Sequence, residues 1–252
     1  MALSPAAVYC GTGMSTASSA SPARDVTLVH SSDIHVDGGV ADGTAPLRLV
    51  LATARNLDAD LVILAGDTFE HNRLPLDLLG DAARLLEGAG RPVVILPGNH
   101  DPLTPESAFH RGRIGELANV SVLGITHDEA VHFPEFDLEI WGRAHRDYGN
   151  MAPLAVARPR RARWHIAMAH GHYEPAPDPA IVLCPSWLIS DEEIAATGAD
   201  YVALGHWNRA IKVGNGAVAA YYSGSPDLAA TVNLVRLTVA GEVVVSREPI
   251  RP

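Results

Sequence analysis

The chain has 252 residues, 47% of them hydrophobic and 19% charged, which is sufficient for one large globular domain or two small domains sharing a core. No apolar run approaches the roughly 20 residues that a membrane-spanning helix needs, so we expect no membrane partner. The formal net charge of −10 argues against a protein that binds duplex nucleic acid by broad neutralisation of its phosphates.

The first 24 residues are rich in alanine, serine, glycine and threonine and contain no basic residue before Arg24. A secretory signal begins with positive charge, which this segment lacks, so we expect residues 1–24 to be a disordered tail. We expect residues 25–252 to form a single domain. Cys10 lies in this tail, and Cys184 is the other cysteine of the chain. We therefore expect free thiols and a cytoplasmic location.

Short apolar strands alternate with amphipathic helices from residue 26 onward. The pattern predicts strands over residues 26–30, 61–65 and 93–96, and helices over residues 47–57 and 74–87. This order is typical of an α/β protein with a parallel sheet at its centre. Such sheets carry their chemistry in the loops beyond the carboxyl ends of the strands.

The second half of the chain is less regular. Strands are predicted over residues 120–123, 130–133, 136–141, 164–169 and 201–204, with a loop-rich segment over residues 143–163 and a short helix over residues 191–196. The last strands are predicted over residues 210–213, 217–222, 232–239 and 242–247. We expect these last strands to form an antiparallel meander that ends the fold.

Potential metal ligands follow five of the predicted strands, at the point where each strand ends. In chain order the groups are Asp33 with His35, Asp67, Asn99 with His100 and Asp101, His170 with His172, and His206 with Asn208. Singly, an Asp after a strand is often a helix cap or turn residue, and a lone His is more often a surface residue than a ligand. Together, at one edge of a parallel sheet, the five groups predict a metal site.

The donor types narrow the chemistry. Carboxylate oxygen and imidazole nitrogen without thiolate suit Mn, which we expect first, and also Fe, Zn, Co or Ni, with Mg as a harder alternative. Two such cations roughly 3.5–4 Å apart can clamp a phosphoryl oxygen and lower the pKa of a shared water. Asp67, alone on its loop, is the natural bridge between them. We expect His100 to donate to a phosphoryl oxygen or to protonate the leaving group, and Asp101 to orient that imidazole.

At these residues the sequence resembles the calcineurin-like metallophosphoesterase superfamily. The family pattern is Asp-x-His, Gly-Asp, Gly-Asn-His-Asp/Glu, a His before Gly-x, and Gly-His-x-His, and the resemblance runs from about residue 25 to the final strands. Similarity to the branch that contains bacterial DNA-repair exonucleases is carried by the run Tyr222-Ser223-Gly224-Ser225-Pro226. The resemblance implies a four-layer α/β/β/α sandwich, in which two mixed sheets pack face to face with helices outside.

The resemblance also implies a role for each of these residues. Asp33 and His35 would bind the first metal, Asp67 would bridge, and Asn99, His170 and His206 would bind the second. His100 would be the catalytic imidazole beside the scissile phosphate, and His172 would line the substrate pocket.

One position departs from the family pattern, because Asn208 stands where the family has the last His of Gly-His-x-His. An Asn can ligate through its amide oxygen, but it is neutral and a weaker donor than imidazole. We therefore expect the first site to bind metal less tightly or to prefer a harder cation such as Mn or Mg, unless a water takes the place of Asn208.

The expected function is metal-dependent hydrolysis of a small or nucleotide-like phosphate ester, either a monoester or a diester. The exonucleases carry a further capping domain and partner with an ATPase, whereas this acidic chain ends soon after its last strands. DNA exonuclease or endonuclease activity is therefore the alternative. A nuclease would need basic residues to bind DNA, and four arginines cluster at Arg158, Arg160, Arg161 and Arg163. These arginines form either an anion-binding patch or a solvated loop. A non-catalytic scaffold is a second alternative. The oligomeric state stays open, with a homodimer as the commonest assembly.

Overall fold

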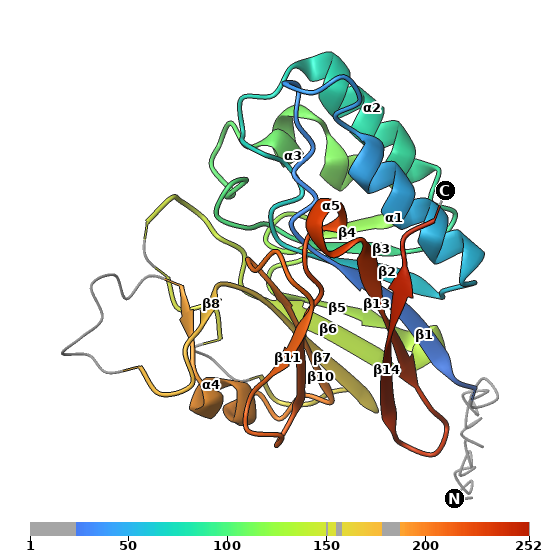
Figure 1. Cartoon of the computed structure of the whole chain (residues 1–252), viewed down its shortest axis with the longest axis vertical. Coiled ribbons are helices and arrows are strands. Elements are labelled where there is room, and N and C mark those ends of the chain that lie inside the picture. Colours follow the sequence, from blue (N-terminus) through green and yellow to red (C-terminus); the bar gives the residue numbers. More distant parts are fainter. Residues whose placement is uncertain (1–23, 150, 155–157, 178–186, 252) are drawn as a thin grey trace, which may run out of the picture.

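The computed structural model of the protein describes residues 24–149, 151–154, 158–177 and 187–251. The expectations of a disordered tail and of free thiols at Cys10 and Cys184 fall outside these ranges. None of the helices within the ranges combines the length and the apolar character that crossing a bilayer demands. The described chain forms two six-stranded sheets that pack against each other, and a separate pair of short strands (Figure 1).

The first sheet consists of β1 (Val26–Ser31), β2 (Leu61–Ala65), β3 (Val93–Leu96), β4 (Val120–Val122), β13 (Thr231–Leu237) and β14 (Val243–Pro249). Its strand order is β14-β13-β1-β2-β3-β4. Strands β1 to β4 run parallel, while β13 is antiparallel to β1 and β14 is antiparallel to β13. The three parallel strands predicted in the first third of the chain are confirmed at the centre of this sheet.

The second sheet consists of β5 (Ala130–Phe133), β6 (Leu138–Gly142), β7 (Trp164–His170), β10 (Tyr201–Gly205), β11 (Ile211–Val213) and β12 (Ala219–Tyr222). Its strand order is β11-β12-β10-β7-β6-β5. The four inner strands are parallel, and β5 and β11 are antiparallel edges. Beyond β7, the short strands β8 (His172–Tyr173) and β9 (Leu188–Ile189) pair in parallel.

Helices cover the outer faces of the sheets unequally. The helices are α1 (Ala45–Asn56), α2 (Leu76–Glu87), α3 (Ala108–Arg111), α4 (Asp191–Ala196) and α5 (Pro226–Ala229), with short 3-10 turns η1 (Ile114–Glu116) and η2 (Pro134–Phe136). Figure 1 shows α1 and α2 side by side over the first sheet, with α4 beyond the second. Apolar residues three or four positions apart make one face of α1, and Leu47, Val50 and Ala54 are fully buried on it. The four-layer α/β/β/α sandwich is confirmed, and its layer outside the second sheet is the thinner one in the described chain.

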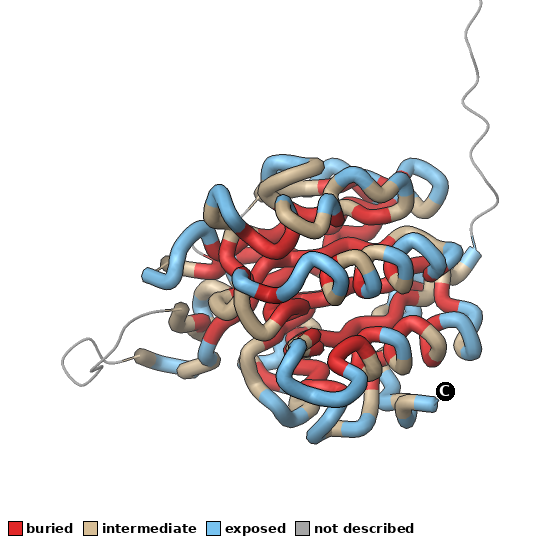
Figure 2. Tube along the Cα trace, turned by 90° about the horizontal axis from the view of Figure 1, so that it is seen from above, coloured by how far each residue is buried: buried red, intermediate tan, exposed pale blue. Residues whose placement is uncertain are grey.

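Three apolar layers hold the sheets and helices together. One lies between the helices and the first sheet, one between the two sheets, and one outside the second sheet. Figure 2 shows the buried segments running through the middle of the molecule. Because both faces of β2, β3 and β7 are covered, these strands are buried along their whole length and read as continuous apolar runs. The polar residues after such strands are therefore carried on a rigid base.

The predicted terminal meander is wrong. Strands β11 and β12 form a hairpin, but β12 then pairs in parallel with β10, and the next strand, β13, leaves for the first sheet. The change of sheet is made by Gly224, with φ +75°, the short α5 and Ala230, with φ +54°. Alternation of apolar and polar residues indicates a strand but does not say which sheet it joins. A smaller difference is that Phe136 ends a 3-10 turn, so that β6 begins only at Leu138.

Candidate metal centre

Loops from both sheets meet at a cavity of about 510 Å³. Its polar lining comes from the loop after β1 with Asp33 and His35, the loop after β2 with Asp67 and Glu70, the loop after β3 with His100, and the loop after β10 with His206 and Asn208. Ser225, Asp227 and Leu228 at α5 complete it. Predicted ligands from four strand ends are thus brought together in space. No lysine or arginine is among the described residues that line the cavity.

His170, at the end of β7, joins the cluster from behind Asp67. Its Nε2 lies 3.0 Å from Asp67 Oδ2 and 3.0 Å from the amide oxygen of Asn99. The same amide oxygen lies 3.2 Å from Nδ1 of His206. On the other side of the ring, His170 Nδ1 donates to the carbonyl of Ala65 at 2.9 Å. This backbone bond sets the tautomer and directs Nε2 toward the acidic cluster, as in imidazoles that ligate metals.

Asp67 and His170 form a buried charge pair in the absence of a cation. Burial is the largest single influence on the pKa of His170 and lowers it, but the charges of Asp67 and Asp33 and the hydrogen bonds to Asp67 and Ala65 together raise this pKa to about 9. Burial raises the pKa of Asp67 in turn, but the charge and hydrogen bond of His170 hold it well below its usual range. A proton on His170 therefore occupies the position that a cation would take, and cation binding has to displace it.

Asp33 is held by backbone and hydroxyl donors. Both of its carboxylate oxygens accept from the backbone N–H of His206, at 3.2 and 3.0 Å, and Oδ2 accepts from Ser32 Oγ at 2.5 Å. Ser32 Oγ lies 2.9 Å from Ser223 Oγ, at the end of β12. These contacts tie the loop after β1 to the loops after β10 and β12. Ser223, which belongs to the run Tyr222-Ser223-Gly224-Ser225-Pro226, therefore has a structural role beside the site.

The backbone is strained at four of the predicted ligands. Asp33, His35 and Asp67 have φ values of +52°, +50° and +51°. His206 has φ +106°. Each non-glycine residue in this region costs on the order of 1 kcal/mol, and such residues cluster at functional sites. The surrounding sheet therefore holds these loops in conformations that local preference would not select.

Two glycines leave room for the acidic cluster. A Cβ on Gly98 would lie 2.1 Å from Asp67 Oδ1, and a Cβ on Gly66 would lie 1.9 Å from His170 Nδ1. Gly66 also has φ +92°, which side chains rarely adopt. Any side chain at either position would displace Asp67 or His170, so these glycines are required by the close approach of the loops.

His100 lies at the mouth of the cluster. Its backbone N–H donates to Asp67 Oδ1 at 2.9 Å, and its ring Nδ1 donates to the carbonyl oxygen of Glu70 at 3.0 Å. The side chain is 40% exposed and lines the cavity. The structure corrects the expectation for Asp101, whose two oxygens instead accept from the backbone N–H groups of Gly98, at 2.7 Å, and Phe69, at 3.0 Å. Asp101 shapes the loop after β3, and the acceptor beside the ring of His100 is the backbone carbonyl of Glu70.

His172 and Asn208 lie at the edge of the centre. Asn208 lines the cavity and is exposed. The ring of His172 is 6.5 Å from that of His206, it accepts a hydrogen bond from Trp207 Nε1 at 3.1 Å, and it is exposed. The structure does not place His172 among the residues that line the cavity, because its ring turns toward Trp207.

Two residues of the centre were missed in the sequence. Glu70 lies three positions after Asp67, and its Oε2 is 2.6 Å from His35 Nδ1. His145 follows β6, and its Nε2 donates to the carbonyl of His170 at 2.9 Å. Burial lowers the pKa of His145 to about 4, so the ring is neutral. The position of His145 just beyond a strand end was an available signal, whereas nothing local distinguished Glu70 from an ordinary loop carboxylate.

The donor atoms fit divalent cations. The group of His35, Glu70 and His100 has ligand atoms that all lie within 4.8 Å of one another, and so do two further groups, namely Asp33 with His35 and Asp67, and Asp67 with His170 and His206. Asp67 belongs to both of these further groups. Carboxylate and imidazole donors in such sets are those that bind Mn, Fe or Zn in proteins.

The family-defining sequence pattern of calcineurin-like phosphoesterases matches residues 26–209, a segment that contains every residue of the centre named above except those at β12 and α5. The chain belongs to the calcineurin-like phosphoesterase family. Family membership confirms the resemblance carried by the strand-end motifs and supports phosphoester hydrolysis with bound metal.

Similar proteins agree with this membership. The chain is 27% identical over 244 residues to the D component of the nuclease SbcCD from Bacillus subtilis (strain 168). That match covers 79% of the chain but 61% of the relative, so the chain spans less than two thirds of the relative's length. Similar folds are found in TT1561 of Thermus thermophilus, with a TM-score of 0.59, 14% identity and coverage of 91% of this chain and 100% of that one. A presumed 5′-nucleotidase from Staphylococcus aureus, solved with alpha-ketoglutarate, has a TM-score of 0.59, 15% identity and coverage of 90% and 55%.

Proposed function

We propose that the chain hydrolyses a small or nucleotide-like phosphate ester, a diester or a monoester, with water activated between two divalent cations, Mn first among them. The single observation that carries this proposal is that Asp67 belongs to two ligand groups at the floor of one open cavity. A carboxylate with two oxygens can serve two cations, and the groups on either side offer separate donors. We also propose that residues 25–252 form a single domain and that the protein is cytoplasmic. The pairing of β1 with β13 in one sheet joins the two ends of this range and supports the single domain.

The ligand assignment follows from these groups. We assign Asp33, His35 and Asn208 to the first cation, Asn99, His170 and His206 to the second, and Asp67 to both. Bound cations would supply Lewis-acid chemistry, which neutralises phosphoryl oxygens and lowers the pKa of a water. The loops after β1, β2, β3 and β10 hold these donors in place before any ligand arrives, since their backbones are already fixed by hydrogen bonds to one another.

His100 is assigned to the phosphoryl group. Its Nδ1–H is engaged by the carbonyl of Glu70, so the exposed Nε2 is the atom that faces an incoming ester. When the ring carries a proton on both nitrogens, Nε2 would donate a hydrogen bond to a phosphoryl oxygen or transfer that second proton to the leaving group, which leaves the neutral Nδ1–H form. His172, outside the lining of the cavity, is placed to contact a substrate group that extends past His206.

The arginine cluster favours a small substrate over nucleic acid. Arg160 donates to Asp200 at 2.7 and 3.1 Å, Arg158 lies 3.3 Å from Glu129, and Arg163 donates to the carbonyl of Val239 at 2.6 Å. These three side chains are engaged within the protein. A phosphate backbone would have to compete with those contacts for each guanidinium.

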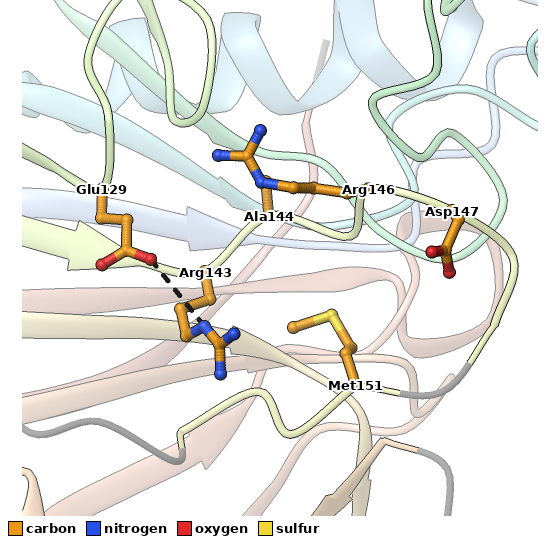
Figure 3. A pocket seen from close by; sticks show the side chains of 6 residues that line it. All are labelled: Glu129, Arg143, Ala144, Arg146, Asp147 and Met151. Atoms are coloured by element: carbon orange, nitrogen blue, oxygen red, sulfur yellow. Dashed lines mark ion pairs between the residues drawn. The ribbon is translucent and has the colours of Figure 1, made fainter.

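A second pair of arginines does not form a phosphate cradle either. Arg143 and Arg146 line a smaller cavity of about 130 Å³ beyond the end of β6 (Figure 3). Arg143 Nε lies 3.8 Å from Glu129 Oε1, and Figure 3 shows the two guanidinium groups pointing away from each other. Joint binding of one phosphate by both guanidinium groups needs them to converge. The nuclease remains the second candidate, since the relative from Bacillus subtilis is part of a nuclease.

One preparation tested with Mn against several esters discriminates these functions. We expect hydrolysis of bis(4-nitrophenyl) phosphate or a nucleotide ester, a loss of at least roughly a hundredfold on removal of metal by a chelator, and recovery on adding Mn. Short single-stranded DNA cleaved faster than every small ester, with strong salt dependence, would support the nuclease candidate instead. A metal-loaded protein that turns over none of these substrates would contradict both.

A further inference from the structure

Glu70 lies between two imidazoles of the centre, although no sequence motif singles it out. The loops after β1 and β2 are joined by a parallel bridge between Val36 and Phe69, and the N–H of Glu70 donates to the carbonyl of Val36 at 3.0 Å. This backbone link brings Glu70 to His35 and His100. The two rings are perpendicular to each other with centroids 4.8 Å apart.

The side chain and the backbone of Glu70 face different rings. Its carboxylate Oε2 lies 2.6 Å from Nδ1 of His35, while Oε1 is 3.5 Å from Nδ1 of His100. His100 Nδ1 makes its hydrogen bond to the backbone carbonyl of Glu70, at 3.0 Å. The carbonyl accepts a hydrogen bond from His100 Nδ1, whereas the carboxylate contact with His35 Nδ1 has the distance of an ion pair without the geometry of a hydrogen bond. A carboxylate is an acceptor only, so at this distance it favours a proton on His35 Nδ1 over one on Nε2. The carboxylate therefore acts chiefly on His35.

We propose that Glu70 is a positioning residue, whose carboxylate fixes the tautomer and orientation of His35 so that its Nε2 serves the first cation. This inference rests on the proposed function. The contact between Glu70 and His35 matters for the first cation, because His35 is the one imidazole in the ligand group with Asp33 and Asp67. Asn208, assigned to the same cation, is a neutral amide and a weak donor. A carboxylate behind a ligating imidazole raises its basicity, and losing such a partner costs about 10- to 100-fold in metal affinity.

Two substitutions of increasing severity test the proposal. Glu70→Gln keeps the shape and a neutral acceptor, and Glu70→Leu removes the acceptor. We expect Mn affinity, measured by calorimetry on the full chain, to fall in the order wild type, Gln, Leu, with a loss of about 10- to 100-fold for Leu. Glu135→Gln, an exposed residue outside the cavity, is the matched control and should bind Mn as the wild type does.

A second readout separates positioning from a general structural role. Proton–nitrogen correlation spectra of the metal-free chain, labelled at histidine, report which ring nitrogen carries the proton. In Glu70→Leu we expect His35 to lose its fixed Nδ1–H form, while His100 keeps it because its partner is the backbone carbonyl. Since these spectra require no hydrolysis, a chain that is inactive on every ester but shows this change would refute the proposed function and leave the inference on Glu70 intact.

Two outcomes would overturn the inference. An unchanged His35 tautomer together with unchanged Mn affinity in Glu70→Leu would show that the carboxylate does not act on the ring. A loss of Mn affinity well beyond about 100-fold in Glu70→Gln, which keeps an acceptor for His35, would exceed the effect of a positioning residue and show that Glu70 is itself a ligand. Should the Leu variant fail to fold, the Gln variant still decides between these results.

Discussion

Asp67→Asn is expected to lower kcat/KM for a phosphodiester by roughly 10³-fold. Asp67 is 2% exposed, and it contacts both His170 and the backbone N–H of His100. Its replacement by a neutral amide removes the charge shared by the two ligand groups. Bound cations contribute several kcal/mol to phosphoryl transfer, and each 1.36 kcal/mol corresponds to a tenfold change in rate. Mn binding should weaken in parallel, which calorimetry measures.

The same variant should remain folded, because Asn has nearly the shape of Asp and can still accept from His100. Far-ultraviolet circular dichroism and thermal unfolding of the metal-free protein check this. Asp77→Asn, in the exposed first turn of α2, makes the same change of charge away from the cavity and should leave both rate and Mn affinity unchanged. An Asp67→Asn enzyme with the wild-type rate would show that the bridge is assigned to the wrong residue.

His100→Ala is expected to lower kcat by about 10²- to 10⁴-fold, the usual contribution of a general acid or base. In contrast to Asp67→Asn, this change should leave Mn stoichiometry and affinity close to wild type, because His100 Nδ1 is bound to a carbonyl and its Nε2 faces the cavity mouth. The two variants together separate metal binding from proton donation. Steady-state kinetics and a parallel Mn titration give both readouts.

His132→Ala is a suitable control for this experiment, since His132 is exposed on β5. It should match the wild type in both measurements. If His100→Ala lost Mn as severely as activity, His100 would be a ligand and its assignment to the phosphoryl group would be wrong. If it lost neither, the imidazole would have no part in the reaction.

The sequence was informative about the centre because the predicted ligands follow a rule of topology. Asp33 and Asp67 follow neighbouring parallel strands of the first sheet, so their convergence follows from strand direction. His170 ends β7 in the second sheet and reaches Asp67 because the two sheets pack against each other. The departure at Asn208 was also visible, and the structure places that residue in the lining of the cavity.

Contacts that depend on tertiary packing were not predictable in this way. Glu70 reaches His35 because a bridge joins Val36 to Phe69, which no local pattern encodes. Asp101 has the position of an orienting carboxylate in the sequence, but its two oxygens accept from the backbone N–H groups of Gly98 and Phe69. The departure of β13 for the first sheet has the same origin. Its alternating pattern fits either sheet, and the turn at Gly224 and Ala230 decides between them.

The most direct test of the centre is a crystal grown or soaked with Mn, measured for anomalous scattering. We predict two peaks roughly 3.5–4 Å apart with Asp67 between them, one beside Asp33 and His35 and the other beside His170 and His206. A single peak, or peaks that avoid Asp67, would contradict a cation pair held by that carboxylate.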